Sequence, residues 1–518
     1  MKRNKVFSSS IAFILLMSIV LAGCQSVGGV DINKALLSQY ELTTYESDAE
    51  YSIEFIVDEE VEQTKEEKDL LKYLQNATIT MDEIKSEDLY TQSMKGALQL
   101  PFIDKIPFEM MVSQQDVTIL VEGLNKPINI NSYMDQDMPE DLDINLEEFE
   151  QAGIDLVKLI SKFIIENTPN PSTIEVESVE EKVNGKKMEL NQIHVKIDGS
   201  ELIPLFVEAV QNMFEDEEEL KQFISDLYDI YVPLIIASMP EEVLEDPSSQ
   251  MILSYLENKD LSVEYAFTFL MTNVKPYIAD LEVMLEEFIN DPVMNEIFSE
   301  NNYLVTDIYV DEDLNIRKQT MELVIQPDME DMGAIQGFKL YGESDVWNID
   351  GNVKAATIDT TEVIDLTDVD NVSPAIFFKE MDRESTLYEL LDHFELTTNR
   401  FYVYPHEDIE YVSYYDFPIM VDGVTYASEG YLLSELDVTT EWVAENQISI
   451  VDIMTEKEIL ITLDSNEAIV DGETVQMSNT PVVIEGEAHF PLRFVVKNLD
   501  ALIYFDEEMK RIVITKEY

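Results

Sequence analysis

Acidic residues with the spacing of a calcium loop are the clearest chemical pattern in this chain of 518 residues. Asp311, Asp313, Asn315 and Glu322 fall at positions 1, 3, 5 and 12 of a loop whose oxygen ligands would surround Ca²⁺. Such a loop needs glycine at position 6 for its sharp turn, and that position is Ile316. Because apolar residues alternate on both sides of this stretch, we expect a β-hairpin there and no metal site.

Other metal-ligand patterns are weak. The acid-rich stretch 135–148 also lacks the glycine and the final glutamate, which leaves open only a loose cation surface. Zinc and copper centres usually draw histidines from short spacings, and no two histidines here lie within ten residues of one another. We therefore expect surface or strand histidines rather than ligands at His194, His393, His406 and His489.

Motifs for nucleophilic or nucleotide chemistry are missing from the sequence. It has no G-x-S-x-G, no P-loop and no G-x-G-x-x-G, and its one cysteine, Cys24, lies near the N-terminus. A sequence with 106 acidic residues contains many possible pairs of carboxylates, so such pairs do not indicate a catalytic site. We expect no catalytic residues and no cofactor.

The first residues, "MKRNKVFSSSIAFILLMSIVLAGCQS", combine a basic start with an apolar run of twelve residues, which is too short to span a membrane. Leu-Ala-Gly-Cys at its end resembles the lipobox of bacterial lipoproteins, in which the cysteine becomes the acylated N-terminus. This resemblance implies a signal peptide over residues 1–24, lipidation of Cys24, and a place on the outer face of a cell membrane. Residues 25–47 would be a tether.

The charge balance is extreme, with 33 basic against 106 acidic residues and a net charge of −73. Such a surface repels nucleic acid and anionic headgroups, so no nucleic-acid partner is expected. Apolar residues still make up 45% of the chain, which predicts folded cores under a solvated acidic shell.

Period-two alternation predicts strands from about residue 51 to 131, beginning with Tyr51, Ile53 and Phe55 on one face. A helix follows up to the "TPNPS" breaker, then a hairpin turning at Asn184-Gly185. Helices capped by Ser200 run to about residue 300, and strands resume up to about residue 359. The predicted fold class is α+β: an antiparallel meander with helical insertions packed on one face, over residues 48–360.

This arrangement resembles bacterial lipoprotein-carrier folds, which implies an apolar ligand between sheet and helices as one hypothesis. The alternative is that the large apolar side chains of the helices only fill the core between helices and sheet. These side chains are Phe206, Phe214, Met239, Phe267, Phe269 and Met284.

The C-terminal region contains an internal repeat. After a linker with a short helix at 361–394, residues 395–518 hold two related units offset by sixty-three residues, so that Gly423 corresponds to Gly486 and Trp442 to Phe505. Asp422-Gly423 and Glu485-Gly486 are predicted turns, and Ser428 and Pro491 are predicted helix starts. We expect small tandem ββαβ-type modules in which Trp442 and Phe505 pack beneath the helices.

The second of these repeats resembles the copper amine oxidase N-terminal-like domain through its glycine, its Pro-Leu-Arg-Phe helix start and its aromatic-Asp strand. The matching residues are Gly486, Pro491, Leu492, Arg493, Phe494, Leu499, Ala501, Phe505 and Asp506. Asp500 replaces the glycine that is usual in this family. The first repeat lacks Pro-Leu-Arg and has Ser428, Glu429 and Gly430 in its place. In that family the module is a stalk remote from the oxidase site, and it recurs in many Gram-positive surface proteins, which favours a Gram-positive source. The oxidase forms its quinone cofactor from a tyrosine in an Asn-Tyr-Asp/Glu motif, and the only Asn-Tyr here, Asn302-Tyr303, is followed by Leu304.

The sequence therefore predicts a membrane-anchored surface lipoprotein that is not an enzyme. We expect a role in binding, adhesion, wall association or scaffolding, with a cell-wall or surface-protein partner. The alternative is a carrier of an apolar or lipid ligand in the middle domain.

Overall fold

The structure is a computed structural model that describes residues 27–113, 116–131, 146–237, 239, 253–254, 256–329, 333–366, 373–404, 418–484 and 486–518. The signal segment with Cys24, residues 135–145, His406 and Glu485 lie outside the described residues. The described chain forms two compact units, one from residues before 116 and from 146 to 357, the other from residues 116–131 and from 358 onward.

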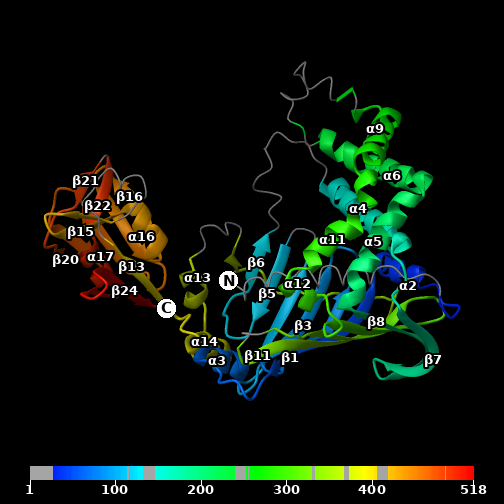
Figure 1. Ribbon diagram of the computed structural model, residues 1–518. Coiled ribbons are helices and arrows are strands. Elements are labelled where there is room, and N and C mark those ends of the chain that lie inside the picture. Colours follow the sequence, from blue (N-terminus) through cyan, green and yellow to red (C-terminus); the bar gives the residue numbers. More distant parts are fainter. Residues whose placement is uncertain are drawn as a thin grey trace. The chain divides into compact units, whose positions relative to one another are not determined.

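An antiparallel sheet forms the first unit, with the spatial order β4-β3-β2-β1-β11-β10-β9-β8-β7. The long strands are drawn side by side in Figure 1. This mixed architecture confirms the predicted α+β class. The strands are β1 (Tyr45–Val57), β2 (Ala77–Ser86), β3 (Gln92–Gln99), β4 (Ile106–Val112), β7 (Thr173–Val183), β8 (Lys186–Asp198), β9 (Tyr303–Val310), β10 (Ile316–Ile325) and β11 (Ile335–Trp347).

Helices connect these strands and cover part of one face of the sheet. They are α2 (Ile32–Ser38), the 3₁₀ turn η1 (Gln39–Glu41), α3 (Lys65–Leu74), α4 (Leu146–Asn167), α5 (Gly199–Glu215), α6 (Glu217–Ala237), α9 (Lys259–Asn273), α10 (Lys275–Ile278), α11 (Leu281–Ile289) and α12 (Pro292–Ile297). The main core lies where α2, α5 and α12 pack on β8, β9 and β10, with Ile197, Leu202 and Ile297 fully buried.

The hairpin predicted at Asn184-Gly185 is confirmed. Both residues have positive φ, of 45° and 72°, and the whole of β7 pairs with β8. The helix that follows is capped by Asp198 and not by Ser200, because Asp198 Oδ1 accepts the backbone N–H of Ser200 at 3.0 Å.

Three parts of the first unit differ from the prediction. Residues 27–47, expected as a tether, include α2, whose Ile32 belongs to the main core. The charged run after residue 59 contains α3, which a capping box between Thr64 and Glu67 starts. Residues 351–359, expected as a strand, form none, because the amides of Ala355 and Ala356 bond to the side chains of Glu87 and Ser93.

The second unit is made of short strands and helices. They are β5 (Asp116–Val121), β6 (Ile128–Asn131), β12 (Ile364–Asp365), α13 (Ala375–Lys379), α14 (Thr386–His393), β13 (Thr398–Val403), β14 (Ile419–Val421), β15 (Val424–Ser428), α16 (Glu429–Glu435), β16 (Val438–Ala444), β17 (Gln447–Asp452), β18 (Glu458–Thr462), β19 (Glu467–Val470), β20 (Glu473–Gln476), β21 (Val482–Ile484), β22 (Glu487–Pro491), α17 (Leu492–Asn498), β23 (Leu502–Asp506) and β24 (Arg511–Glu517). The short helix predicted within the linker at 361–394 is confirmed as α14, whereas α13 was not predicted, and both helices belong to this unit.

The internal repeat is visible as two matching runs of elements. β14-β15-α16-β16-β17 repeats as β21-β22-α17-β23-β24, and both α16 and α17 begin sixty-three residues apart, as the sequence predicts. β15 pairs with β22 antiparallel, so that Tyr426 faces Pro491 and Ser428 faces His489. Ala427 faces Phe490, which occupies the equivalent position of the second repeat. Because equivalent residues face each other there, a local two-fold axis passes through this pair.

The two halves obtain their third strand differently. In the first half, β18 follows along the chain and pairs with β17. In the second half the corresponding place beside β24 is taken by β13, which precedes both repeats, and gives a sheet with the order β13-β24-β23. The segment just before the repeats is therefore an integral strand of the second half.

Candidate functional site

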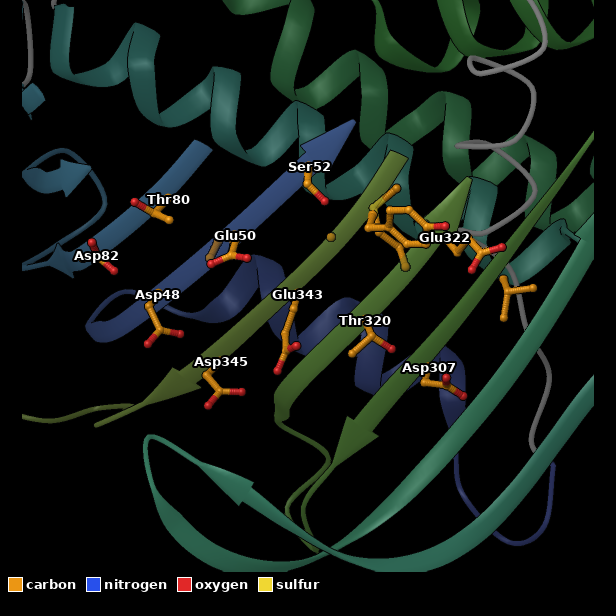
Figure 2. A pocket seen from close by; sticks show the side chains of 15 residues that line it. Asp48, Glu50, Ser52, Thr80, Asp82, Asp307, Thr320, Glu322, Glu343 and Asp345 are labelled. Carbon is orange, nitrogen blue, oxygen red and sulfur yellow. The ribbon is translucent and has the colours of Figure 1, made fainter. Parts of the chain in front are cut away.

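The most prominent chemical feature of the first unit is a carboxylate-lined cavity on the polar face of its sheet. The cavity has a volume of about 700 Å³ and is lined by side chains from β2, β1, β11, β10 and β9. Figure 2 shows these side chains standing on one face of neighbouring strands. Its carboxylates are Asp48, Glu50, Asp82, Asp307, Glu322, Glu343 and Asp345.

Strand register explains why these acids meet. Glu50 faces Glu343 directly, and Asp48 faces Asp345, because β1 and β11 are antiparallel with side chains alternating between the two faces. Thr320 of β10 lies opposite Glu343 on one side and Asp307 on the other. Directly opposed like charges cost free energy, so the register places two unfavourable pairs within one cavity.

The electrostatics of the site follow from this crowding. Burial, and next the charge of Asp345, raise the pKa of Asp48 above its ordinary range. Lys318 is a cation beside this cavity: burial lowers its pKa, but the hydrogen bond and ion pair with Glu343 outweigh burial and leave the pKa raised. Asp345 Oδ2 accepts the backbone N–H of Asn184 at 2.8 Å, while its Oδ1 is buried without a hydrogen bond in the described structure.

The rim of the cavity is held by hydrogen bonds. The Tyr303 hydroxyl donates to Glu322 at 3.0 Å. Asp307 Oδ1 accepts from Gln192 Nε2 and also contacts His194 Nδ1, both at 2.8 Å. These contacts orient carboxylates, and together the seven acids can concentrate counter-ions over the sheet. In the part of the chain that the structure describes, no group of three or more His, Cys, Asp or Glu side chains has a geometry that could hold a metal ion.

The stretch with calcium-loop spacing is a hairpin turn between β9 and β10, as predicted. Asp311 Oδ1 accepts the amides of Asp313 and Asn315 at 3.0 and 2.9 Å, and its Oδ2 accepts Arg317 Nε at 2.6 Å. Both oxygens of Asp311 are therefore used inside the turn. Glu322 lies far along β10 and belongs to the acidic cavity.

The described histidines lie in separate places. His194 is on β8, and His393 ends α14. His489 on β22 is buried and its Nδ1 lies 3.1 Å from the carbonyl oxygen of Glu487.

One apolar cavity in the described part of the first unit lies between two helices, whereas the sequence predicts a pocket between sheet and helices. An apolar cavity of about 670 Å³ lies between α6 and α9, lined by Tyr228, Val232, Val263 and Ala266 among others. The predicted apolar helix residues also divide: Phe214 and Phe267 pack in a second core formed by α4, α5, α6 and α9, whereas Phe269 and Met284 are exposed. They do not form one core between helices and sheet, because α6 packs on α4 and α9 packs on α6.

The family-motif residues of the second repeat are mostly packing residues. Gly486 has φ 94°, which favours glycine, and Pro491 is the N-cap of α17 rather than its first turn. Leu492 is fully buried, Phe494 is partly buried and Arg493 is exposed. Leu499 and Ala501, which end α17 and lead into β23, are also buried.

Two aromatic placements were predicted wrongly. Phe505 is 43% exposed and Trp442 is 41% exposed, so neither fills a core. Phe505 is exposed because it lies on β23, which is an edge strand. The Trp442 indole N–H instead donates to the Glu429 carboxylate at 2.9 Å. Asp506 closes the β23–β24 turn by accepting the amides of Met509 and Glu508.

Comparison with known families gives one match. Residues 408–514 match the model of the copper amine oxidase N-terminal domain. No curated protein and no solved structure matches this chain. Within the described residues, no helix is long and apolar enough to cross a membrane. The two-fold repeat at the C-terminal end, with Pro-Leu-Arg-Phe at the start of α17, is therefore a copper amine oxidase N-terminal-like domain, a non-catalytic domain.

Proposed function

We propose that this chain is an extracellular surface lipoprotein, anchored in the cell membrane through acylated Cys24, with a non-enzymatic role in binding, adhesion, wall association or scaffolding. The observation that carries the proposal is the construction of the C-terminal domain. Its family signature is used for architecture, because the signature residues Leu492, Leu499 and Ala501 are buried in the core of the domain. A module whose signature builds a core suits a stalk or a docking platform.

The anchor is tested by fractionating cells that express the chain. The parent protein is expected in the membrane fraction and Cys24→Ala in the soluble or secreted fraction, because two or more acyl chains bind membranes stably. Ser26→Ala is the matched control and should stay membrane-bound. A Cys24→Ala protein that still fractionates with membranes contradicts the anchor.

The non-enzymatic role is tested by metal analysis and an amine oxidase assay on the chain from residue 25 onward. Neither stoichiometric copper nor amine-dependent peroxide formation is expected. One copper per chain together with turnover would overturn this part of the proposal.

A second candidate, a carrier of an apolar ligand, is favoured by the cavity between α6 and α9. Its walls are dominated by apolar and aromatic side chains, and its volume of about 670 Å³ suits a small lipid. Native mass spectrometry of the chain from residue 25 onward should show a co-purified mass that Ala266→Trp removes by filling the cavity. A parent protein with only its bare mass would exclude this candidate.

A further inference from the structure

The second unit contains a cavity that neither the family match nor the proposed function explains. It has a volume of about 650 Å³ and lies among the β5–β6 hairpin, α13, α14 and the start of β13. This volume is in the range of small-molecule pockets. The walls are largely apolar and include Leu124, Phe377, Phe378, Met381, Leu387 and Leu391.

Main-chain hydrogen bonds hold these walls in place. The amide of Asp382 donates to the carbonyl of Gly123 at 2.7 Å, and the amide of Asn125 donates to the carbonyl of Glu380 at 2.8 Å. The Phe378 ring stacks on Tyr518 with centroids 4.7 Å apart. The cavity is therefore built by the fold, and a ligand would not have to organise it.

The wall side chains are incompletely buried by the protein itself. Phe377, Leu387 and Leu391 are only half-buried, although each is large and apolar. Covering these side chains would be favourable, because it would remove apolar surface from water. A ligand that covers this surface would therefore present an apolar group to it.

The rim of the cavity carries charge of both signs. Arg400 lines it, and so does Glu395. The chain has only 33 basic residues against 106 acidic ones, so an arginine that lines an apolar cavity stands out against the background charge. A guanidinium pairs best with a planar carboxylate, to which it can donate two parallel hydrogen bonds.

We propose that this cavity binds a single-chain carboxylate amphiphile, a fatty acid, with its hydrocarbon chain against the apolar walls and its carboxylate on Arg400. Glu395 repels that carboxylate and places it at the Arg400 end of the cavity. The site is independent of the α6–α9 cavity and of the surface role, because it is built from other residues in the other unit.

The test is calorimetric titration of dodecanoate into the chain from residue 25 onward, below the micelle concentration. Dodecanoate should bind with one site, and Arg400→Gln should weaken it about tenfold through loss of the charge-assisted pair. Glu395→Gln should instead tighten binding, because it removes a repulsion. Dodecanol should bind equally to the parent and Arg400→Gln, and Arg493→Gln, in the same unit, should change nothing.

Filling the cavity gives a second readout. Leu387→Trp should abolish dodecanoate binding while the protein keeps a cooperative thermal transition, and Ala266→Trp, in the other cavity, should leave binding unchanged. The proposal is overturned if dodecanoate does not bind, if Arg400→Gln and Glu395→Gln shift its affinity in the same direction, or if Ala266→Trp alone removes the binding.

Discussion

Glu50 of β1 and Glu343 of β11 face each other across two hydrogen-bonded strands, on the same face of the sheet. Directly opposed carboxylates repel one another, so Glu50→Gln should stabilise the first unit by about 0.5 kcal/mol at low salt. The gain should shrink as ionic strength rises, since exposed charges are screened. Urea unfolding at two salt concentrations measures this. Glu177→Gln is the control, because Glu177 faces the neutral Gln192.

Asp48 gives the acidic cavity a defined pH dependence. Its folded pKa lies above the ordinary value of 3.8, so the folded protein binds the proton more tightly than the unfolded chain. Ionised Asp48 therefore costs stability at neutral pH, and this cost fades as the pH falls through the raised pKa and vanishes below the ordinary value. Asp48→Asn should raise the thermal unfolding temperature at pH 7 and change it little near pH 3. An equal shift at both pH values would exclude this origin.

The two aromatic residues Phe490 and Phe505 both lie in the C-terminal domain but differ in burial. Phe490 is fully buried on the two-fold axis, whereas Phe505 is 43% exposed. Phe490→Ala should therefore destabilise the second unit by about 3–5 kcal/mol and Phe505→Ala by less than about 1 kcal/mol. Denaturant unfolding of both variants measures the difference. Similar losses would show that Phe505 contributes to the core after all.

The equivalent residues Asp437 and Asp500 have the same backbone conformation, with φ of 51° and 58°, but different surroundings. Asp437 is buried and accepts from Ser373, Asn399 and Tyr518. Asp500 pairs with Lys457 at the surface. Asparagine tolerates this conformation, so the substitution isolates the charge.

Asp437→Asn should cost about 2 kcal/mol, because a buried acceptor of several hydrogen bonds is weakened, and Asp500→Asn below about 0.5 kcal/mol. A second readout is the ionisation of Tyr518. Burial, and next the charge of Asp437, raise the pKa of this phenol, so Asp437→Asn should lower it in an ultraviolet pH titration. An unchanged Tyr518 titration would contradict the contact.

Much of the fold could be predicted from local patterns. Asn184-Gly185 fixes a hairpin through its own backbone preference, and the sixty-three-residue repeat predicts two equal modules. The pairing of β13 with β24 could not be predicted, because the two strands lie at opposite ends of the domain sequence. Pairing between distant strands has no signature in the sequence near either strand. The helix at Lys65–Leu74 was recognisable from its capping residues, Thr64 and Glu67, within a run that otherwise looks only charged.

The acidic cavity was missed for a similar reason. In the sequence, carboxylates occupy alternate positions of a strand, such as Asp48 and Glu50. On a single strand this pattern indicates only a face that is exposed to solvent. Only the register of β1 with β11 reveals that these acids oppose Asp345 and Glu343. The exposure of Phe505 was missed because strand order, and not the aromatic residue, decides whether a position lies at an edge.

The pair Ala427 and Phe490 has a consequence for how the tandem domain is built. In a dimer of two identical modules, the residue on the axis would face itself, which gives either two phenylalanines competing for one space or two alanines leaving a void. Joining the modules in one chain makes the axis position two separate sites, so a small side chain can face a large one. Covalent linkage also makes their association independent of protein concentration. The same freedom lets one copy drop Pro-Leu-Arg while the other retains it.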